Sequence, residues 1–289
     1  MGVIMKKILL TLTLIMSGAQ ALRADTGRLW EPIDWTFSNP SYSGNPFDII
    51  ASATFTHTRS GSQIVTQLYY NGADTSTWTL RFTGTRTGQW TYQTSSSDPQ
   101  LNNLTGSVNV QDNPNPRIKG FLVSQGNKFA RQIGANGELQ ARRFHVYMNL
   151  DAYDVENRPL DNFQDMAQFQ DYLDDARQYG FDTVFMHVKN SWFSLGADKH
   201  TQHSSQNPDP RTFVILENMI KLAHSQGMSL HIWCWGDEQR QWTPIGVGGI
   251  NGIPDRRLQR YIAARLGPLP GWSMGYGFDL EEWVNNAQL

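Results

Sequence analysis

Three carboxylates stand within four residues near the end of the sequence, in the stretch GYGFDLEEW (275–283). They are Asp279, Glu281 and Glu282, and an apolar run precedes them. A carboxylate at the end of a buried strand can transfer protons during hydrolysis, so Asp279 and Glu281 are candidate catalytic acids. The same residues also fit a capping box, in which Asp279 caps a helix and Glu282 reaches back to it. Both interpretations stay open.

Other polar and aromatic side chains follow further apolar runs, and their types suit a sugar ligand. Amides, carboxylates and basic groups form hydrogen bonds with hydroxyls, and aromatic rings pack against the flat apolar faces of sugar rings. The candidate substrate-binding residues are Asn149, Asp151, His187, Lys189, Trp192, Trp235, Asp237, Glu238, Arg240 and Tyr276. For Asp237, Glu238 and Arg240 the alternative is a local ion-pair cluster at a turn.

Metal and cofactor chemistry finds little support in the sequence. His200 and His203 are spaced as H-x-x-H, but no third ligand accompanies them, and a solvated loop is the better explanation. The sequence contains neither a glycine-rich phosphate loop nor a G-x-S-x-G nucleophile motif. We therefore expect no metal and no cofactor.

The elements that must position these residues alternate between strands and helices. Amphipathic helical stripes separate the apolar runs, which predicts a parallel sheet with the candidate residues at the carboxyl ends of its strands. If Trp233 faces the covering helices, Cys234 faces the opposite side, because side chains alternate along a strand. The predicted strands span residues 143–150, 181–188, 228–235 and 271–278.

The first half of the chain shows a different period. From Trp30 to Val110 apolar and polar residues alternate in short runs, and turn sequences such as Asn71-Gly72 separate these runs. Short strands at this spacing are typical of an antiparallel, Ig-like β-sandwich. The sequence DNPNP (112–116) marks a stiff polar linker after the sandwich.

Composition and the N-terminus narrow the functional class. With a net charge of −2 over 289 residues, nothing favours nucleic acid or an anionic membrane as a partner. Lys6 and Lys7, a short apolar run and the small residues of Ala19-Gln20-Ala21 predict a signal peptide over residues 1–21. A single cysteine, Cys234, excludes an intrachain disulfide. We expect a secreted or periplasmic protein without a membrane span. The sequence carries no signal for the oligomeric state.

The length of the second half suggests an incomplete barrel. Residues 143–289 hold four predicted strands and three helical stripes, whereas a complete eightfold barrel takes about 250 residues. We therefore expect the first half of a (β/α)8 TIM barrel, and a chain that is a fragment of a longer protein.

Stretches in both halves of the chain resemble secreted bacterial glycoside hydrolases of the retaining (β/α)8-barrel clan. The N-terminal β-sandwich of these enzymes is usually classed as a domain of unknown function. The stretches that carry the resemblance include WEPIDWTF (30–37), LRFTGTRTGQWTYQT (80–94), FHVYMNLDAY (144–153), HIWCWGDEQR (231–240) and RYIAARLGPLPGWSMGYG (260–277). The resemblance implies hydrolysis of a polysaccharide or oligosaccharide by two carboxyl groups.

One position departs from the pattern of that clan. Its fourth strand ends in Asn-Glu within W-x-x-G-N-E, and the Glu is the general acid/base. Here Tyr276 replaces the Asn and Gly277 replaces the Glu. The clan's nucleophile lies on strand seven, for which this chain has no candidate. A non-catalytic carbohydrate-binding or scaffolding protein with a degenerate barrel is therefore the alternative function.

The expected fold is thus multidomain, an antiparallel β-sandwich followed by an α/β domain. The expected divisions are a signal peptide (1–21), the sandwich (25–112), a linker (113–118) and half of a glycosidase-like TIM barrel (119–289). The expected partner is a carbohydrate substrate.

Overall fold

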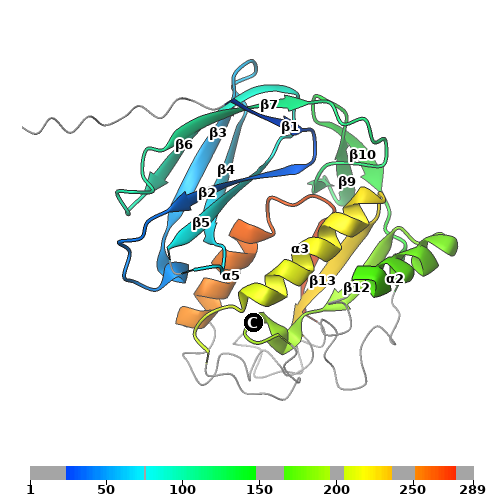
Figure 1. Cartoon of the computed structure of the whole chain (residues 1–289). Coiled ribbons are helices and arrows are strands. Elements are labelled where there is room, and N and C mark those ends of the chain that lie inside the picture. Colours follow the sequence, from blue (N-terminus) through cyan, green and yellow to red (C-terminus); the bar gives the residue numbers. More distant parts are fainter. Residues whose placement is uncertain (1–23, 75, 148–165, 196–204, 236–250, 278–289) are drawn as a thin grey trace, which may run out of the picture.

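A computed structural model describes residues 24–74, 76–147, 166–195, 205–235 and 251–277. Within these ranges the chain forms three sheets and three α-helices (Figure 1). None of the helices in these ranges combines the length and the apolar character that a bilayer crossing requires. The predicted signal peptide lies outside the described residues.

The largest sheet has seven strands, hydrogen-bonded in the order β1-β7-β6-β3-β4-β5-β2 (Figure 1). β1 runs parallel to β7, and the other neighbours are antiparallel. The two edge strands β1 and β2 also contact each other, so the sheet curls into a nearly closed barrel. The strands are β1 (Ala24–Arg28), β2 (Pro32–Ser38), β3 (Ala51–His57), β4 (Gln63–Tyr70), β5 (Thr77–Thr83), β6 (Gly88–Ser96) and β7 (Thr105–Gln111).

Strand β4 makes this sheet continuous. Its residues 63–67 pair with β3, and its residues 68–70 pair with β5. A strand that changes partner along its length joins what would otherwise be two separate sheets. Aromatic rings fill the interior, where Phe55 and Phe82 stack with ring centroids 4.0 Å apart.

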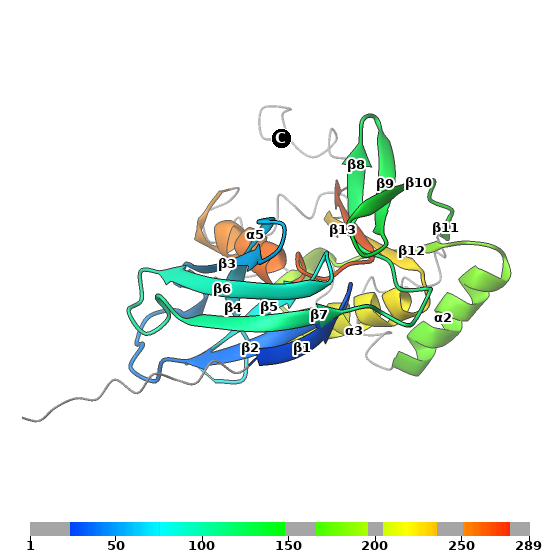
Figure 2. The same ribbon diagram turned by 90° about the horizontal axis from the view of Figure 1, so that it is seen from above.

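A small antiparallel sheet follows, in the order β10-β9-β8, with β8 (Leu122–Gln125), β9 (Lys128–Ile133) and β10 (Glu138–Arg142). Figure 2 shows the β8–β9 hairpin projecting away from the layer of the seven-stranded sheet. Arg131 of β9 is 2% exposed and donates to the carbonyl of Gly227, which lies just beyond the end of helix α3. This contact anchors the hairpin, and burial lowers the pKa of Arg131 to about 10.

The third sheet is parallel, in the order β11-β12-β13-β14, and helices pack against one of its faces. The core on this face includes Leu173, Leu216 and Ile262 from the three helices and Val184 and Ile232 from the strands. The strands are β11 (Val146–Tyr147), β12 (Thr183–His187), β13 (Ser229–Trp235) and β14 (Trp272–Gly277). The helices are α2 (Met166–Gln178), α3 (Pro210–Ser225) and α5 (Ile253–Arg265), with 3-10 turns η1 (Pro46–Asp48) and η3 (Lys189–Trp192).

The expected β-sandwich followed by half of a TIM barrel is wrong as a description of this fold. The structure is mostly sheet: the seven strands form one curved mixed sheet, and only three α-helices occur in the described ranges. Alternation of apolar residues identifies strands but not their partners, so it could not reveal that β4 pairs on both sides or that β1 lies parallel to β7.

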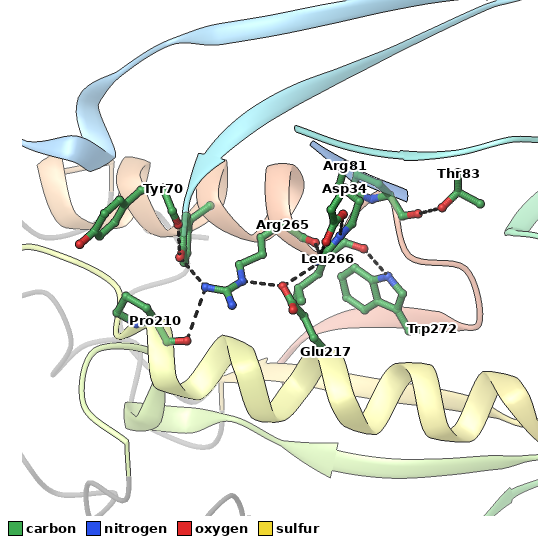
Figure 3. Close-up of polar contacts among 11 residues, drawn as sticks. Asp34, Tyr70, Arg81, Thr83, Pro210, Glu217, Arg265, Leu266 and Trp272 are labelled. Atoms are coloured by element: carbon green, nitrogen blue, oxygen red, sulfur yellow. Dashed lines mark hydrogen bonds and ion pairs between the residues drawn. The ribbon is translucent and has the colours of Figure 1, made fainter. Parts of the chain in front are cut away.

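Buried ion pairs join the seven-stranded sheet to the helices. Arg81 of β5 is 2% exposed and donates from Nη1 to Oε1 of Glu217 on α3, at 2.8 Å. Arg265 of α5 donates from Nε to the same oxygen at 2.5 Å. Figure 3 shows the two guanidinium groups converging on Glu217 from opposite elements. One carboxylate thus connects three elements.

Further groups complete this cluster. Arg81 makes a two-pronged contact with Asp34, with both hydrogen bonds at 2.8 Å, and donates to the carbonyl of Arg265. Both guanidinium groups lie over the ring of Tyr69. The ring centroid is 5.2 Å from Cζ of Arg81 and 5.3 Å from Cζ of Arg265. Burial raises the pKa of Glu217, but the charges of Arg81 and Arg265 outweigh it and hold that pKa below the usual value. Glu217 is therefore ionised at neutral pH.

We predict that Glu217→Gln strongly destabilises the protein at neutral pH, because two buried arginines lose their shared counter-charge. Removing one member of a buried ion pair costs about 3–5 kcal/mol. The free energy of unfolding in urea measures the effect. Asp174→Asn is the matched control, since its pair with Arg177 is about half exposed and contributes about 0–1 kcal/mol.

The same variant has a predictable pH dependence. Because the pKa of Glu217 is lower in the folded state, its contribution is present above the usual glutamate pKa of 4.5 and is lost as the pH falls through the folded value. The difference in stability between wild type and Glu217→Gln should therefore shrink on acidification. A difference that stays constant down to acid unfolding would contradict this assignment.

Candidate functional site

The face of the parallel sheet opposite the helices gathers polar and aromatic side chains toward the carboxyl ends of its strands. In the strand register Phe185 of β12 pairs with His231 of β13, and His231 pairs with Ser273 of β14. One step further along, His187 pairs with Trp233, and Trp233 pairs with Gly275. Alternate residues of the same strands pack against the helices. These side chains therefore share the face that the helices leave uncovered.

His187 and Trp233 form an aromatic pair on this face. Their ring centroids lie 5.8 Å apart with an interplanar angle of 25°, and Phe185 meets Trp233 edge-on at 4.8 Å. His187 is 7% exposed, whereas Trp233 is half-buried. His187 is a predicted site residue, and the structure places it beside an indole that the sequence analysis did not select for the site.

A chain of hydrogen bonds fixes Trp233. Its Nε1–H donates to Nε2 of His231 at 2.8 Å, and Nδ1 of His231 lies 2.8 Å from Oγ of Ser273. Because Nε2 accepts, the proton of the neutral imidazole belongs on Nδ1, which donates to Ser273. Burial lowers the pKa of His231 below its usual value of 6.5, which keeps the ring neutral.

This arrangement restricts the chemistry that these residues can perform. A nucleophilic serine needs a neighbouring base that accepts its proton. The nitrogen of His231 that faces Ser273 already carries a proton, so the pair is not an activated Ser–His nucleophile. No group of three potential metal ligands occurs among the residues that the structure describes. The trio His231, Trp233 and Ser273 therefore holds an indole in place and can form one wall of a binding site.

Gly275 is required by this wall. A Cβ at this position would lie 2.6 Å from Cδ1 and 2.7 Å from Nε1 of Trp233. The missing side chain lets the indole lie across β14. This is a physical reason for the glycine in the sequence Trp272-Ser273-Met274-Gly275, which the resemblance singled out.

Two predicted substrate-binding tryptophans belong to the hydrophobic core cluster that includes residues of the three helices. Trp192 and Trp235 are both 0% exposed. The indole N–H of Trp192 donates to the carbonyl of Cys234 at 2.7 Å, and its ring packs against Phe213. Cys234 packs on the helix side of the sheet, so Trp233 faces away from the helices. This is the reverse of the orientation considered from the sequence. What the structure shows for both tryptophans is packing, and their contact with substrate stays a prediction.

The remaining predicted site residues cannot be placed. For Lys189 and Tyr276 the structure describes only the backbone, in η3 and β14 respectively. The others lie outside the described residues: Asn149, Asp151, Asp237, Glu238, Arg240, Asp279 and Glu281.

His231, Trp233 and Ser273 were not predicted to be members of one site. A signal for two of them exists in SLHIWCW (229–235), where Leu230, Ile232 and Cys234 occupy one face. The other face carries the hydrogen-bonding side chains of His231 and Trp233. A buried parallel strand with polar groups on only one face indicates that this face has a task beyond packing.

Comparison with known proteins gives one family and several related structures. Residues 26–97, within the seven-stranded sheet, match DUF5060, a domain of unknown function. No curated protein matches the chain. A candidate glycoside hydrolase from Bacteroides vulgatus has a similar structure, with a TM-score of 0.63 and 20% identity over 88% of this chain. This chain spans 49% of that protein, so the likeness concerns about half of it.

Two further structures are more distant. An endocellulase from Pyrococcus horikoshii gives a TM-score of 0.37 and 15% identity, over 56% of this chain and 44% of its own. A β-mannanase from the blue mussel Mytilus edulis gives 0.32 and 14%, over 54% and 45%. At these scores neither supports an argument. The Bacteroides likeness shows that this chain has the fold of a protein named as a glycoside hydrolase.

We predict that His231→Phe moves the indole N–H resonance of Trp233 in an NMR spectrum, because the indole loses its acceptor. A lost buried hydrogen bond also costs about 1–3 kcal/mol of stability. In wild type the same resonance should titrate with a midpoint below 6.5, since protonation of Nε2 removes the acceptor. His145→Phe, at an exposed histidine, is the control. An indole resonance unchanged in His231→Phe would contradict the hydrogen-bond chain.

We also predict that Gly275→Ala displaces Trp233. A forced contact of this kind costs about 1–3 kcal/mol. The cost should shrink in the Trp233→Phe background, because the smaller ring leaves space for the methyl group. Free energies of unfolding for the four proteins of this double-mutant cycle measure the coupling. Strictly additive effects would show that Gly275 is needed for another reason.

Proposed function

We propose that this chain is an exported glycoside hydrolase, or the N-terminal portion of one, that acts on a polysaccharide or oligosaccharide. The fold shared with the Bacteroides protein supports the class of enzyme. The parallel sheet supports the location of the site, because carboxyl ends of parallel strands are where such folds place their chemistry. The class of reaction is general acid/base hydrolysis by carboxyl groups.

The observation that carries the proposal is the register of β13 and β14. Trp235 pairs with Gly277 at the carboxyl ends of these adjacent strands. Two residues further in sequence, each strand leads into an acid: Asp237 after Trp235 and Asp279 after Gly277. The register therefore supports a site at this edge of the sheet, because both acid-bearing segments begin there.

In this proposal Asp279 or Glu281 is the general acid, taking over from the position that Gly277 occupies. The acids after β13, Asp237 and Glu238, contact the substrate. Trp233, fixed by His231, forms a wall beside them. The predicted signal peptide over residues 1–21 is the basis for export.

A non-catalytic carbohydrate-binding protein is the second candidate, and one observation favours it. Gly277 is paired in the sheet at the place where the resemblance calls for a catalytic glutamate, and a glycine has no group to transfer a proton. This alternative keeps the binding wall and removes the reaction.

Activity on a panel of neutral and charged glycans separates the two candidates. The test uses the chain, together with the complete product of its gene where that is longer. We expect release of reducing ends from at least one glycan. Asp279→Asn or Glu281→Gln should lower the rate by about 10²–10⁴-fold, as expected for loss of a general acid. Asp112→Asn, at an exposed carboxylate outside the parallel sheet, should leave the rate unchanged.

Two results would count against catalysis by Asp279 or Glu281. Unchanged rates in both Asp279→Asn and Glu281→Gln would reject the acid assignment. Binding of a glycan without any hydrolysis, in wild type as in the variants, would favour the carbohydrate-binding alternative.

A further inference from the structure

A hollow lined mainly by polar residues lies at one end of the seven-stranded sheet. It has a volume of about 310 Å³, within the range of about 300–1,000 Å³ typical of small-molecule sites. Two loops line it, one after β2 and one between β6 and β7. The lining residues are Asn39, Ser41, Tyr42, Ser43, Gly44, Asp98, Pro99 and Gln100.

Hydrogen bonds between the two loops hold the polar groups of the hollow in place. Asn39, which is 3% exposed, donates from Nδ2 to Asp98 at 2.7 Å and accepts two hydrogen bonds from Ser41. The backbone N–H of Gln100 donates to the other oxygen of Asp98, and the Gln100 amide donates to Oγ of Ser41. Donors and acceptors are therefore ordered before any ligand arrives, which lowers the entropy that binding costs.

Tyr42 supplies an aromatic wall. Its half-buried ring meets Trp78 edge-on with centroids 5.4 Å apart, and its hydroxyl donates to the carbonyl of Asn45. Gly44 lies so close that a Cβ there would be 2.5 Å from the Tyr42 hydroxyl oxygen. The ring is thus fixed from two sides.

The charges of the lining select the ligand. Asp98 is the one ionisable carboxylate among the lining residues, and these residues include no arginine, lysine or histidine. A phosphate, a sulfate or a uronic acid would meet a negative charge without a compensating cation. A single carboxylate is also a poor metal site. Hydroxyl groups, by contrast, can donate to Asp98 and bond to Ser41 and Gln100, and an apolar ring face can lie against Tyr42.

From this combination we propose that the hollow binds a neutral saccharide. The same loop continues to Asn45 and Asp48, which contact Asn207 and Arg257. Asn207 precedes α3, and Arg257 lies in α5. A glycan chain held in the hollow would therefore lie beside a loop that is tied to the region of these helices. The proposal does not require that the chain hydrolyses the glycan.

Titration of the intact chain with neutral oligosaccharides, observed through the NMR signals of the sugar, tests the proposal. Cellotetraose, maltotriose and a mannotetraose are the probes, and an oligogalacturonate is the charged comparison. At least one neutral probe should bind, and the charged one should bind at least about tenfold more weakly. Gln100→Ala should weaken binding by about threefold to tenfold, and Tyr42→Ala by more.

Control variants keep the result interpretable. Gln89→Ala, at an exposed glutamine of β6 outside the hollow, should bind as wild type does. Gln100 is exposed, so Gln100→Ala keeps the test valid even where Tyr42→Ala fails to fold. Binding that survives Gln100→Ala and a folded Tyr42→Ala, equal binding of the oligogalacturonate, or no binding of any neutral probe would overturn the proposal. Because binding is measured without turnover, a failure of hydrolysis is a separate result.

Discussion

The shared carboxylate of Glu217 is the interaction on which the arrangement of the molecule depends. Two arginines from different elements reach it, Arg81 from the seven-stranded sheet and Arg265 from α5. Burying three charged groups is unfavourable unless each finds its partners, so the cluster tolerates few alternative geometries. It also aligns α3 with α5, and these helices cover one face of the parallel sheet. The orientation of the seven-stranded sheet is thereby coupled to that of the parallel sheet.

That coupling gives the candidate site its shape. With the helices on one side, alternation along β12, β13 and β14 leaves His187, Trp233 and Ser273 on the other. The indole of Trp233 is fixed there, because its N–H donates to His231 and its ring packs directly against the backbone of Gly275. A rigid aromatic wall costs little entropy when a ligand binds. The site is built on strands, and the acids proposed to act in it follow those strands in sequence.

Much of the local structure could be predicted from the sequence, whereas the way it assembles could not. The strands β12, β13 and β14 were predicted within one or two residues. The spacing of apolar residues along the chain indicates which residues are buried, and these predictions rest on it. It does not report partners, so it missed the double pairing of β4 and the contact between Arg81 and Glu217, 136 residues apart. The wall around Trp233 was missed for the same reason, because it joins residues of three strands.

The pairing of β14 with β13 changes how the carboxylates of GYGFDLEEW (275–283) are interpreted. Gly277 is the partner of Trp235, so the position that the resemblance assigns to an acid is a paired position of the sheet. Asp279, two residues further along the sequence, lies outside the described residues, and its carboxylate is chemically suited to both a capping role and a catalytic role. Asp279 can begin a helix by accepting backbone N–H groups and still present an oxygen to a ligand, because a carboxylate accepts about four hydrogen bonds. A capping role and a catalytic role for Asp279 are therefore compatible. The backbone N–H groups that donate to its carboxylate would also hold that carboxylate in position.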